Sequence, residues 1–184
     1  MKKYDNSSIS ALKGADRVRK RPAVIFGSDG VEGCEHSMFE ILSNSIDEAR
    51  EGYGSTITVT RYADKSIEVE DFGRGIPVDY NEKEKRYNWE LVFCELYAGG
   101  KYNNNDGGDY EYSLGLNGLG ACATQYSSEY MDVEILRDGF KFNLHFEHGK
   151  NVGGLEKTEF RHRHTGTKIH WKPDLKVFTS IDIP

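Results

Sequence analysis

The sequence contains few cysteines, no long apolar run and no excess of basic residues. Its three cysteines, at positions 34, 94 and 122, are odd in number and widely separated, which fits neither a disulfide framework nor a zinc site. No apolar run approaches the roughly 20 residues that span a bilayer, and the first ten residues lack the apolar core of a signal peptide. We therefore expect a cytoplasmic protein with reduced thiols and no membrane partner.

The net charge of −6 over 184 residues argues against a surface built mainly to bind DNA, because phosphate contacts depend on Lys and Arg. The short basic patch at residues 17–21 fits a solvated or salt-bridged helix face, or a DNA contact made within a larger assembly. Hydrophobic residues make up 37% of the chain, which is enough for one domain with a substantial core.

Strand-like alternation of apolar residues occurs mainly in pairs of segments joined by short turns. Segments at 57–59 and 67–69 flank a turn at 63–65, and segments at 133–135 and 140–146 flank Asp138-Gly139. A further strand is predicted at 167–171. Helices are predicted at 16–20, ended by Pro22, at 33–49, at 88–97 with Asn88 as the cap, and after Gly118. This order predicts one α+β domain, a two-layer sandwich whose mixed, mostly antiparallel sheet carries helices on one face.

The part of the second predicted helix at residues 36–48 has an unusual polar face. At about 100° per residue, His36, Glu40, Asn44 and Asp47 fall within roughly one quarter of its circumference, opposite an apolar stripe. Side chains at i, i+4 and i+8 can contact one another, so an imidazole, a carboxylate and an amide are stacked along one side. Taken alone, this segment also fits an ordinary amphipathic helix.

Two glycine-rich segments follow this helix. The first, DFGRGIP at residues 71–77, indicates a fixed bend that brings backbone close to another group, with Asp71 at a strand end as a hydrogen-bond acceptor. The second runs from residue 99 to GLNGLG at 115–120 and leads into a helix of small residues. Free backbone N–H groups before a helix favour phosphate binding, although such glycines taken alone also fit a flexible loop.

Together and in this order, the three features closely resemble the ATPase region of bacterial type II topoisomerase B subunits, which belong to the GHKL ATPase superfamily. That superfamily also contains mismatch-repair proteins, sensor histidine kinases and heat-shock chaperones. Residues 4–9 and the RKRP segment at 19–22 resemble the topoisomerase branch specifically. The resemblance implies the GHKL ATP-binding fold, ATP and Mg²⁺ as cofactors, and ATP-driven dimerisation that gates DNA strand passage.

The resemblance also implies roles for the polar residues. Glu40 would be the catalytic base that activates water, oriented by His36. Asn44 would bind the nucleotide and act as the protein ligand of Mg²⁺. Asp71 would accept a hydrogen bond from the adenine amino group, with support from Thr167 through water.

Glu48 would pair with Arg74 beside the adenine, although an exposed ion pair is the alternative. Asp47 would lie beyond the phosphates, and Tyr110 would lie in the lid. The apolar walls of the base pocket would be Gly75, Ile76, Pro77 and Ile169. The phosphate ligands would be Lys101, Gly115, Leu116, Asn117, Gly118, Leu119 and Gly120. Asn117 stands where the family usually has a histidine, which alters one phosphate contact.

The resemblance divides the chain into an N-terminal dimerisation arm at residues 1–10 and an ATPase domain at 11–184, which ends before the family's last ATPase elements and its transducer domain. We expect this fragment to be a monomer that binds ATP but hydrolyses it slowly. The expected partners of the full-length protein are a gyrase A-type subunit, DNA and a second copy. A related non-topoisomerase ATPase and a regulatory nucleotide-binding module are the alternatives, and the sequence does not distinguish gyrase from topoisomerase IV.

Overall fold

The structure is a computed structural model that describes residues 14–96 and 120–184. Within these ranges the helices are α1 (Asp16–Arg19), α2 (Pro22–Phe26), α3 (Val31–Arg50), α4 (Asn88–Phe93) and α5 (Gly120–Tyr126). The first strands are β1 (Ile57–Arg61), β2 (Ile67–Asp71), β3 (Tyr80–Asn81) and β4 (Arg86–Tyr87). The later strands are β5 (Ser128–Arg137), β6 (Phe140–Glu147), β7 (Lys150–Asn151), β8 (Glu156–Glu159) and β9 (Gly166–Pro173).

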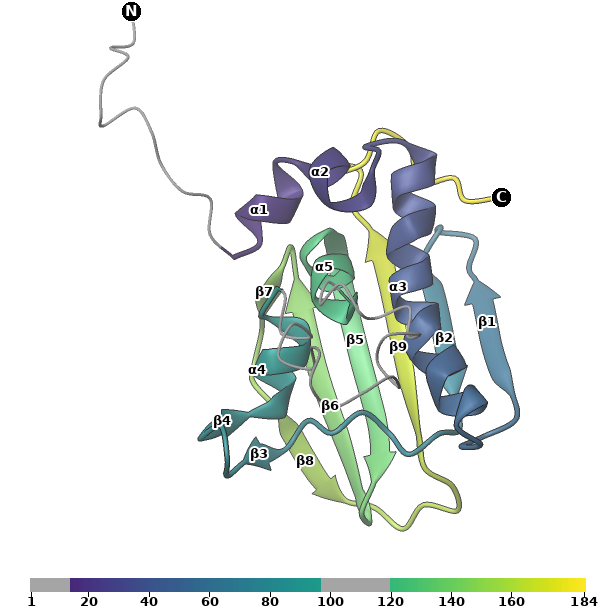
Figure 1. Cartoon of the computed structure of the whole chain (residues 1–184), viewed down its shortest axis with the longest axis vertical. Helices are drawn as coiled ribbons and strands as arrows, with labels where there is room; N and C mark the ends of the chain where they lie inside the picture. Colours follow the sequence, from purple (N-terminus) through teal and green to yellow (C-terminus); the bar gives the residue numbers. More distant parts are fainter. Residues whose placement is uncertain (1–13, 97–119) are drawn as a thin grey trace, which may run out of the picture.

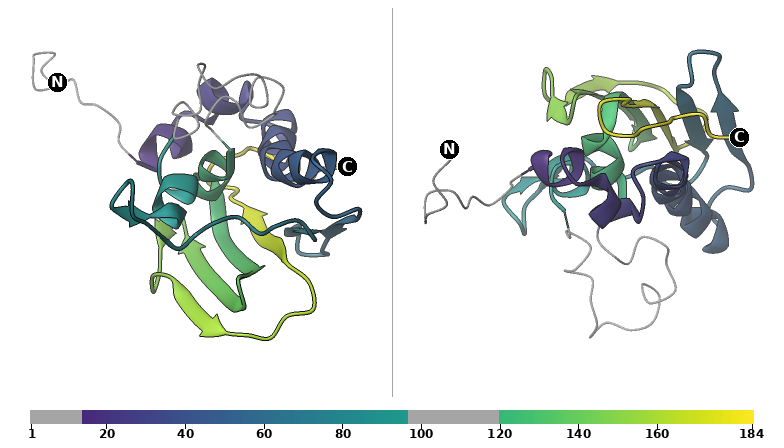
Figure 2. Two further views of the ribbon diagram at one scale, coloured as in Figure 1. Left: turned by 60° about the horizontal axis from the view of Figure 1, so that its bottom comes forward. Right: turned by 90° about the horizontal axis from the view of Figure 1, so that it is seen from above.

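The main sheet has the strand order β1-β2-β9-β5-β6-β7, and β8 also pairs with β6. Every ladder found in the described ranges is antiparallel. Helices α3, α4 and α5 lie over one face of this sheet (Figure 1), and the view from above places the helices on one side of it (Figure 2). The predicted α+β sandwich with helices on one face is confirmed, and β3 and β4 form a separate small hairpin.

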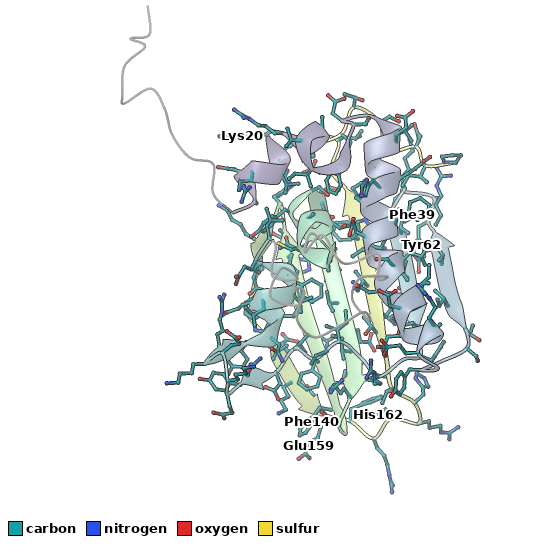
Figure 3. All side chains as sticks on the ribbon, in the orientation of Figure 1. Lys20, Phe39, Tyr62, Phe140, Glu159 and His162 are labelled. Carbon is teal, nitrogen blue, oxygen red and sulfur yellow. The ribbon has the colours of Figure 1, made fainter. Side chains whose placement is uncertain are left out.

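The pairing register explains why the described helices cover only one face of the sheet. One row of paired residues is apolar, and four of its members are buried under the helices: Val69, Ile169, Val133 and Leu144. The fifth, Val59 on the edge strand β1, is exposed. The next row is polar and points to the opposite face, on which no helix of the described residues lies: Glu68, His170, Asp132 and His145. Alternate residues of a strand point to opposite faces, so this two-residue period separates core from solvent. Figure 3 places Lys20 at one end of the molecule and the paired residues Phe140 and Glu159 at the other.

A tight connection before α3 determines where that helix begins. Helix α2 starts with Pro22 and is followed by Gly27 in the left-handed conformation, with φ of 80°. The hydroxyl of Ser28 then accepts a hydrogen bond from the backbone N–H of Gly30 at 2.9 Å. A Cβ on Gly33 would lie 1.9 Å from the carbonyl oxygen of Ser28, so only glycine fits this position. The 20-residue helix α3 therefore packs directly against the preceding turn.

Two details of the predicted helices are wrong. Asn88 is the first residue of α4 and not its cap, because its side-chain oxygen accepts a hydrogen bond from the amide of Asn81 across the β3–β4 hairpin. Helix α4 also ends at Phe93, where Gln125 of α5 donates a hydrogen bond to the carbonyl oxygen of Phe93 and Tyr126 donates one to that of the following Cys94. Pro22 does end α1, but it also begins α2, which the sequence did not predict.

In residues 14–96 and 120–184, every helix is too short or too polar to cross a membrane. The predicted dimerisation arm at residues 1–10 lies outside the described residues.

Candidate functional site

One end of the candidate site is a histidine–glutamate pair on α3. Nε2 of His36 lies 3.1 Å from Oε1 of Glu40, one helical turn later. The Glu40 side chain is buried, and its other oxygen, Oε2, has no hydrogen-bond partner in the part of the chain that the structure describes. Burial raises the pKa of Glu40, while hydrogen bonds from His36 and from the backbone N–H of Gly120 act against this rise. Glu40 therefore holds a proton more readily than an exposed glutamate does.

Asn44 lies one turn beyond Glu40 on the same helix and is half-buried. Its side-chain amide makes no hydrogen bond within the described ranges, so its oxygen is available to a ligand. The same ranges contain no group of three His, Cys, Asp or Glu side chains that could hold a metal ion. A magnesium ion that takes one protein oxygen and fills its other positions with water and phosphate oxygens needs no such group. The donor set at Asn44 therefore fits Mg²⁺ bound together with a phosphate.

The other end of the site is the carboxylate of Asp71, at the last residue of β2. Its Oδ2 accepts a hydrogen bond from the Ser45 hydroxyl of α3 at 2.6 Å. Its Oδ1 accepts hydrogen bonds from the backbone N–H groups of Gly73, at 3.0 Å, and of Thr167 in β9, at 3.4 Å. Asp71 is 7% exposed, so the carboxylate is nearly enclosed by three donors from three segments. Ser45 comes five positions after Glu40, so the two residues lie roughly 7.5 Å apart along the helix axis.

A cluster of charged side chains holds the bend at residues 73–77 against the end of α3. Both oxygens of Glu48 accept hydrogen bonds from the Arg74 guanidinium, at 2.6 and 3.1 Å, and Oε2 also accepts one from the Arg74 backbone N–H at 2.9 Å. The guanidinium also contacts Glu51 at 3.1 Å and lies over the Tyr53 ring, 4.1 Å from its centroid. Burial alone would raise the pKa of Glu48, but the hydrogen bonds and charge of Arg74 outweigh burial and lower it.

The same bend is held from the sheet side by two strands. The hydroxyl of Thr167 accepts a hydrogen bond from the backbone N–H of Ile76 at 3.0 Å. From the end of β5, Nη1 of Arg137 donates to the carbonyl oxygen of Gly75 at 2.8 Å. Neighbouring Gly166 has no room for a side chain, because a Cβ there would lie 2.2 Å from the carbonyl oxygen of Asp71. The bend is therefore fixed by α3, β5 and β9 together.

Comparison with known proteins identifies the family to which the segments around this site belong. The family model described as "Histidine kinase-, DNA gyrase B-, and HSP90-like ATPase" matches residues 31–177, which include α3, the bend and β9. The chain belongs to this ATPase family. It is 41% identical over 182 residues to the B subunit of DNA gyrase from Thermotoga maritima, covering 99% of this chain and 28% of that protein. It is 42% identical over 181 residues to the B subunit of DNA topoisomerase 4 from Staphylococcus epidermidis, covering 96% of this chain and 26% of that protein.

A solved structure supports the family assignment at the level of the fold. The 43K ATPase domain of Thermus thermophilus gyrase B, in complex with an aminocoumarin, superposes with a TM-score of 0.77 and 34% identity. The match covers 94% of this chain and 42% of that one. The chain thus spans less than a third of the length of the two curated relatives named above, although nearly all of its own residues align with them.

The structure brings together most of the site residues predicted on the described segments of this family member. His36, Glu40 and Gly120 meet at one end, and Asp71, Thr167 and the bend meet at the other. Ile169 is 2% exposed and belongs to the hydrophobic core, whereas Pro77 is exposed. Asp47 lies on α3 beside Glu48, and its role in nucleotide binding stays a prediction. The remaining predicted contacts lie outside the described residues: Lys101, Tyr110, Gly115, Leu116, Asn117, Gly118 and Leu119.

Sequence reasoning missed two residues of this site. Ser45 carried no signal, because a serine on the buried side of a helix usually bonds its own backbone. Arg137 was hidden beside the Asp138-Gly139 turn, where a charged residue is ordinary. Its contact with Gly75 spans 62 positions of the sequence, and only the packing of β5 beside the bend reveals it.

Proposed function

We propose that this chain is the ATP-binding and ATP-hydrolysing domain of a type II topoisomerase B subunit. The observation that carries the proposal is the arrangement on α3. A buried glutamate with one oxygen left without a partner among the described residues lies five positions before Ser45, the residue of α3 that donates a hydrogen bond to Asp71. A site with a proton acceptor at one end and a fixed hydrogen-bond acceptor at the other suits a nucleotide lying along the helix.

The Asp71 end is the proposed adenine site. A carboxylate accepts hydrogen bonds and does not donate them, so it favours a purine with a 6-amino group over one with a 6-oxo group. The donors from Gly73 and Thr167 to Oδ1 and from Ser45 to Oδ2 together keep the carboxylate oriented before the base arrives. Such orientation lowers the ordering cost of binding. The bend at residues 73–77 would lie along the edge of the base.

The Glu40 end is the proposed site of hydrolysis. Glu40 accepts a proton from a water molecule while the water oxygen forms a bond to the γ-phosphorus and the bond to the bridging β,γ oxygen breaks, leaving ADP and phosphate. His36 orients the carboxylate through its hydrogen bond. Asn44 would hold Mg²⁺, which supplies charge neutralisation at the phosphate oxygens. The N–H groups at the start of α5 would face the phosphates.

The activity of a complete protein is a further part of the proposal. The named relatives are B subunits of DNA gyrase and of topoisomerase IV, and this chain aligns with about a quarter of each. By likeness to them, ATP would drive pairing of two copies through residues 1–10 and gate DNA passage together with an A-type subunit. The acidic net charge of −6 is consistent with DNA being bound mainly by other parts of such an assembly.

Calorimetric titration tests the nucleotide site directly. Non-hydrolysable analogues of ATP and GTP are titrated with Mg²⁺ into the wild type, Asp71→Asn and the control Asp132→Asn, whose side chain lies on the face of the same sheet opposite the described helices. We expect the wild type and Asp132→Asn to bind the ATP analogue selectively. Asp71→Asn should lose about 10- to 100-fold in affinity, because a hydrogen bond to a charged group is replaced by a mismatched amide. Equal binding of both analogues by the wild type would contradict the proposal.

A further inference from the structure

The buried serines of α3 form two different kinds of hydrogen bond. The hydroxyl groups of Ser37 and Ser43 donate to carbonyl oxygens three residues earlier in the same helix, those of Cys34 and Glu40. This local bond is the usual one for a serine inside a helix. Ser45 instead donates across the layer to Oδ2 of Asp71, which is 26 positions away in the sequence. Its hydroxyl therefore bonds a residue of the candidate site and not a carbonyl group of its own helix.

The two oxygens of Asp71 are held by different kinds of donor. Oδ1 is held by backbone N–H groups, which no side-chain substitution removes. Among the described residues, Ser45 is the only donor to Oδ2. The terminal torsion of an aspartate has a broad energy well, so a carboxylate held at one oxygen can still turn. The Ser45 bond fixes the second oxygen and hence the plane of the group.

We infer that Ser45 is a positioning residue for adenine recognition, acting through Asp71. The inference rests on the proposed function, in which Asp71 accepts the 6-amino group of the base. Ser45 keeps Oδ2 in the direction from which it can accept that group, and its own lone pairs stay available as further acceptors. Its effect is on discrimination between purines, not on the phosphate contacts, which lie at the Glu40 end of the helix.

The test compares two ligands that differ only in the 6-amino group. ADP and purine riboside 5′-diphosphate are titrated with Mg²⁺ into the wild type, Ser45→Ala and Ser43→Ala. Ser43 is the matched control, because it is buried on the same helix but bonds only its own backbone. We expect the wild type and Ser43→Ala to prefer ADP, and we expect Ser45→Ala to reduce that preference by about 3- to 10-fold, the loss typical of one ordinary hydrogen bond, because the bond from Asp71 to the base is weakened and not removed.

The outcomes separate this inference from the proposed function. If the wild type shows no preference for ADP, the assignment of Asp71 to adenine fails. If the wild type prefers ADP and Ser45→Ala keeps the same preference, or weakens both ligands by the same factor, Ser45 has only a structural role and the inference is overturned. Ser45→Cys is the second variant, since it is nearly isosteric but a weak donor. It should also lose preference for ADP, and full retention of that preference would again overturn the inference.

Discussion

The two ends of the site on α3 are built in opposite ways. At the Asp71 end, both oxygens of the carboxylate are hydrogen-bonded, and the neighbouring Glu48 is bound so well by Arg74 that its pKa is lowered. At the Glu40 end, one carboxylate oxygen has no partner among the described residues and the pKa is raised. A buried polar atom without a partner costs free energy, so this end is strained relative to the other.

The difference between the two carboxylates matches two different tasks, recognition of a ligand by Asp71 and proton transfer by Glu40. A group that recognises a ligand works best when it is already fixed, because less freedom is lost on binding. A general base must instead change its protonation state during the reaction, and a fully bonded, low-pKa carboxylate accepts a proton poorly. The same helix therefore lies beside both carboxylates: it carries Glu40, which has an oxygen without a partner among the described residues, and about 1.4 turns later Ser45, which bonds the fully hydrogen-bonded Asp71.

The largest expected effect is on turnover at the Glu40 end. Glu40→Gln keeps the size and the contact with His36 but removes the proton acceptor, so ATP hydrolysis should fall by at least about 100-fold while ATP-analogue affinity changes little. Phosphate release and calorimetry measure the two quantities. Glu32→Gln, at an exposed position of the same helix, is the control. Turnover by Glu40→Gln at the wild-type rate would show that another group is the base.

The pH dependence of stability gives the second contrast between the two ends. The pKa of Glu40 is raised in the folded state, so the folded protein binds a proton more tightly than the unfolded chain does. Its contribution to stability is therefore greatest in acid and falls as pH rises from the ordinary glutamate pKa through the raised one. Glu40→Gln should be more thermostable than the wild type at pH 8, and this advantage should shrink towards pH 4. A difference in melting temperature that stays constant with pH would contradict the assignment.

The smallest expected effect is at the Asp71 end. Arg74→Ala removes the partner of Glu48, but the guanidinium is half exposed, so the free energy of unfolding should fall by only about 0.5–1 kcal/mol at neutral pH. The folded-state pKa of Glu48 is lowered, so this contribution is present above the ordinary glutamate pKa and is lost as pH falls through the lowered one. Urea unfolding at pH 7 and in acid measures it. A loss of equal size in acid would show that Arg74 stabilises through packing on Tyr53 instead.

Local patterns predicted most of the elements that carry the site. The polar stack from His36 to Asn44, the strand that ends at Asp71 and the Asp138-Gly139 turn were all identified from spacing. Both residues of that turn have positive φ, 56° and 81°, as the turn chemistry predicts. The errors at Asn88 and at the end of α4 came from side chains of other segments, which bond the groups that a local cap would have used.

The sequence by itself determined the α+β class, the polar face of α3 and the fixed bend, because helix period, strand period and glycine turns act over a few neighbouring residues. Only the tertiary structure decided that Ser45 binds Asp71, that Arg137 holds Gly75 and that one oxygen of Glu40 is left without a partner in the described residues. These three facts depend on which strand lies beside which helix, and on how closely they pack. A short window of sequence encodes neither the neighbours nor the packing. The partners of the two hydrogen bonds lie 26 and 62 positions apart, and the state of Glu40 depends on how the whole helix layer buries it.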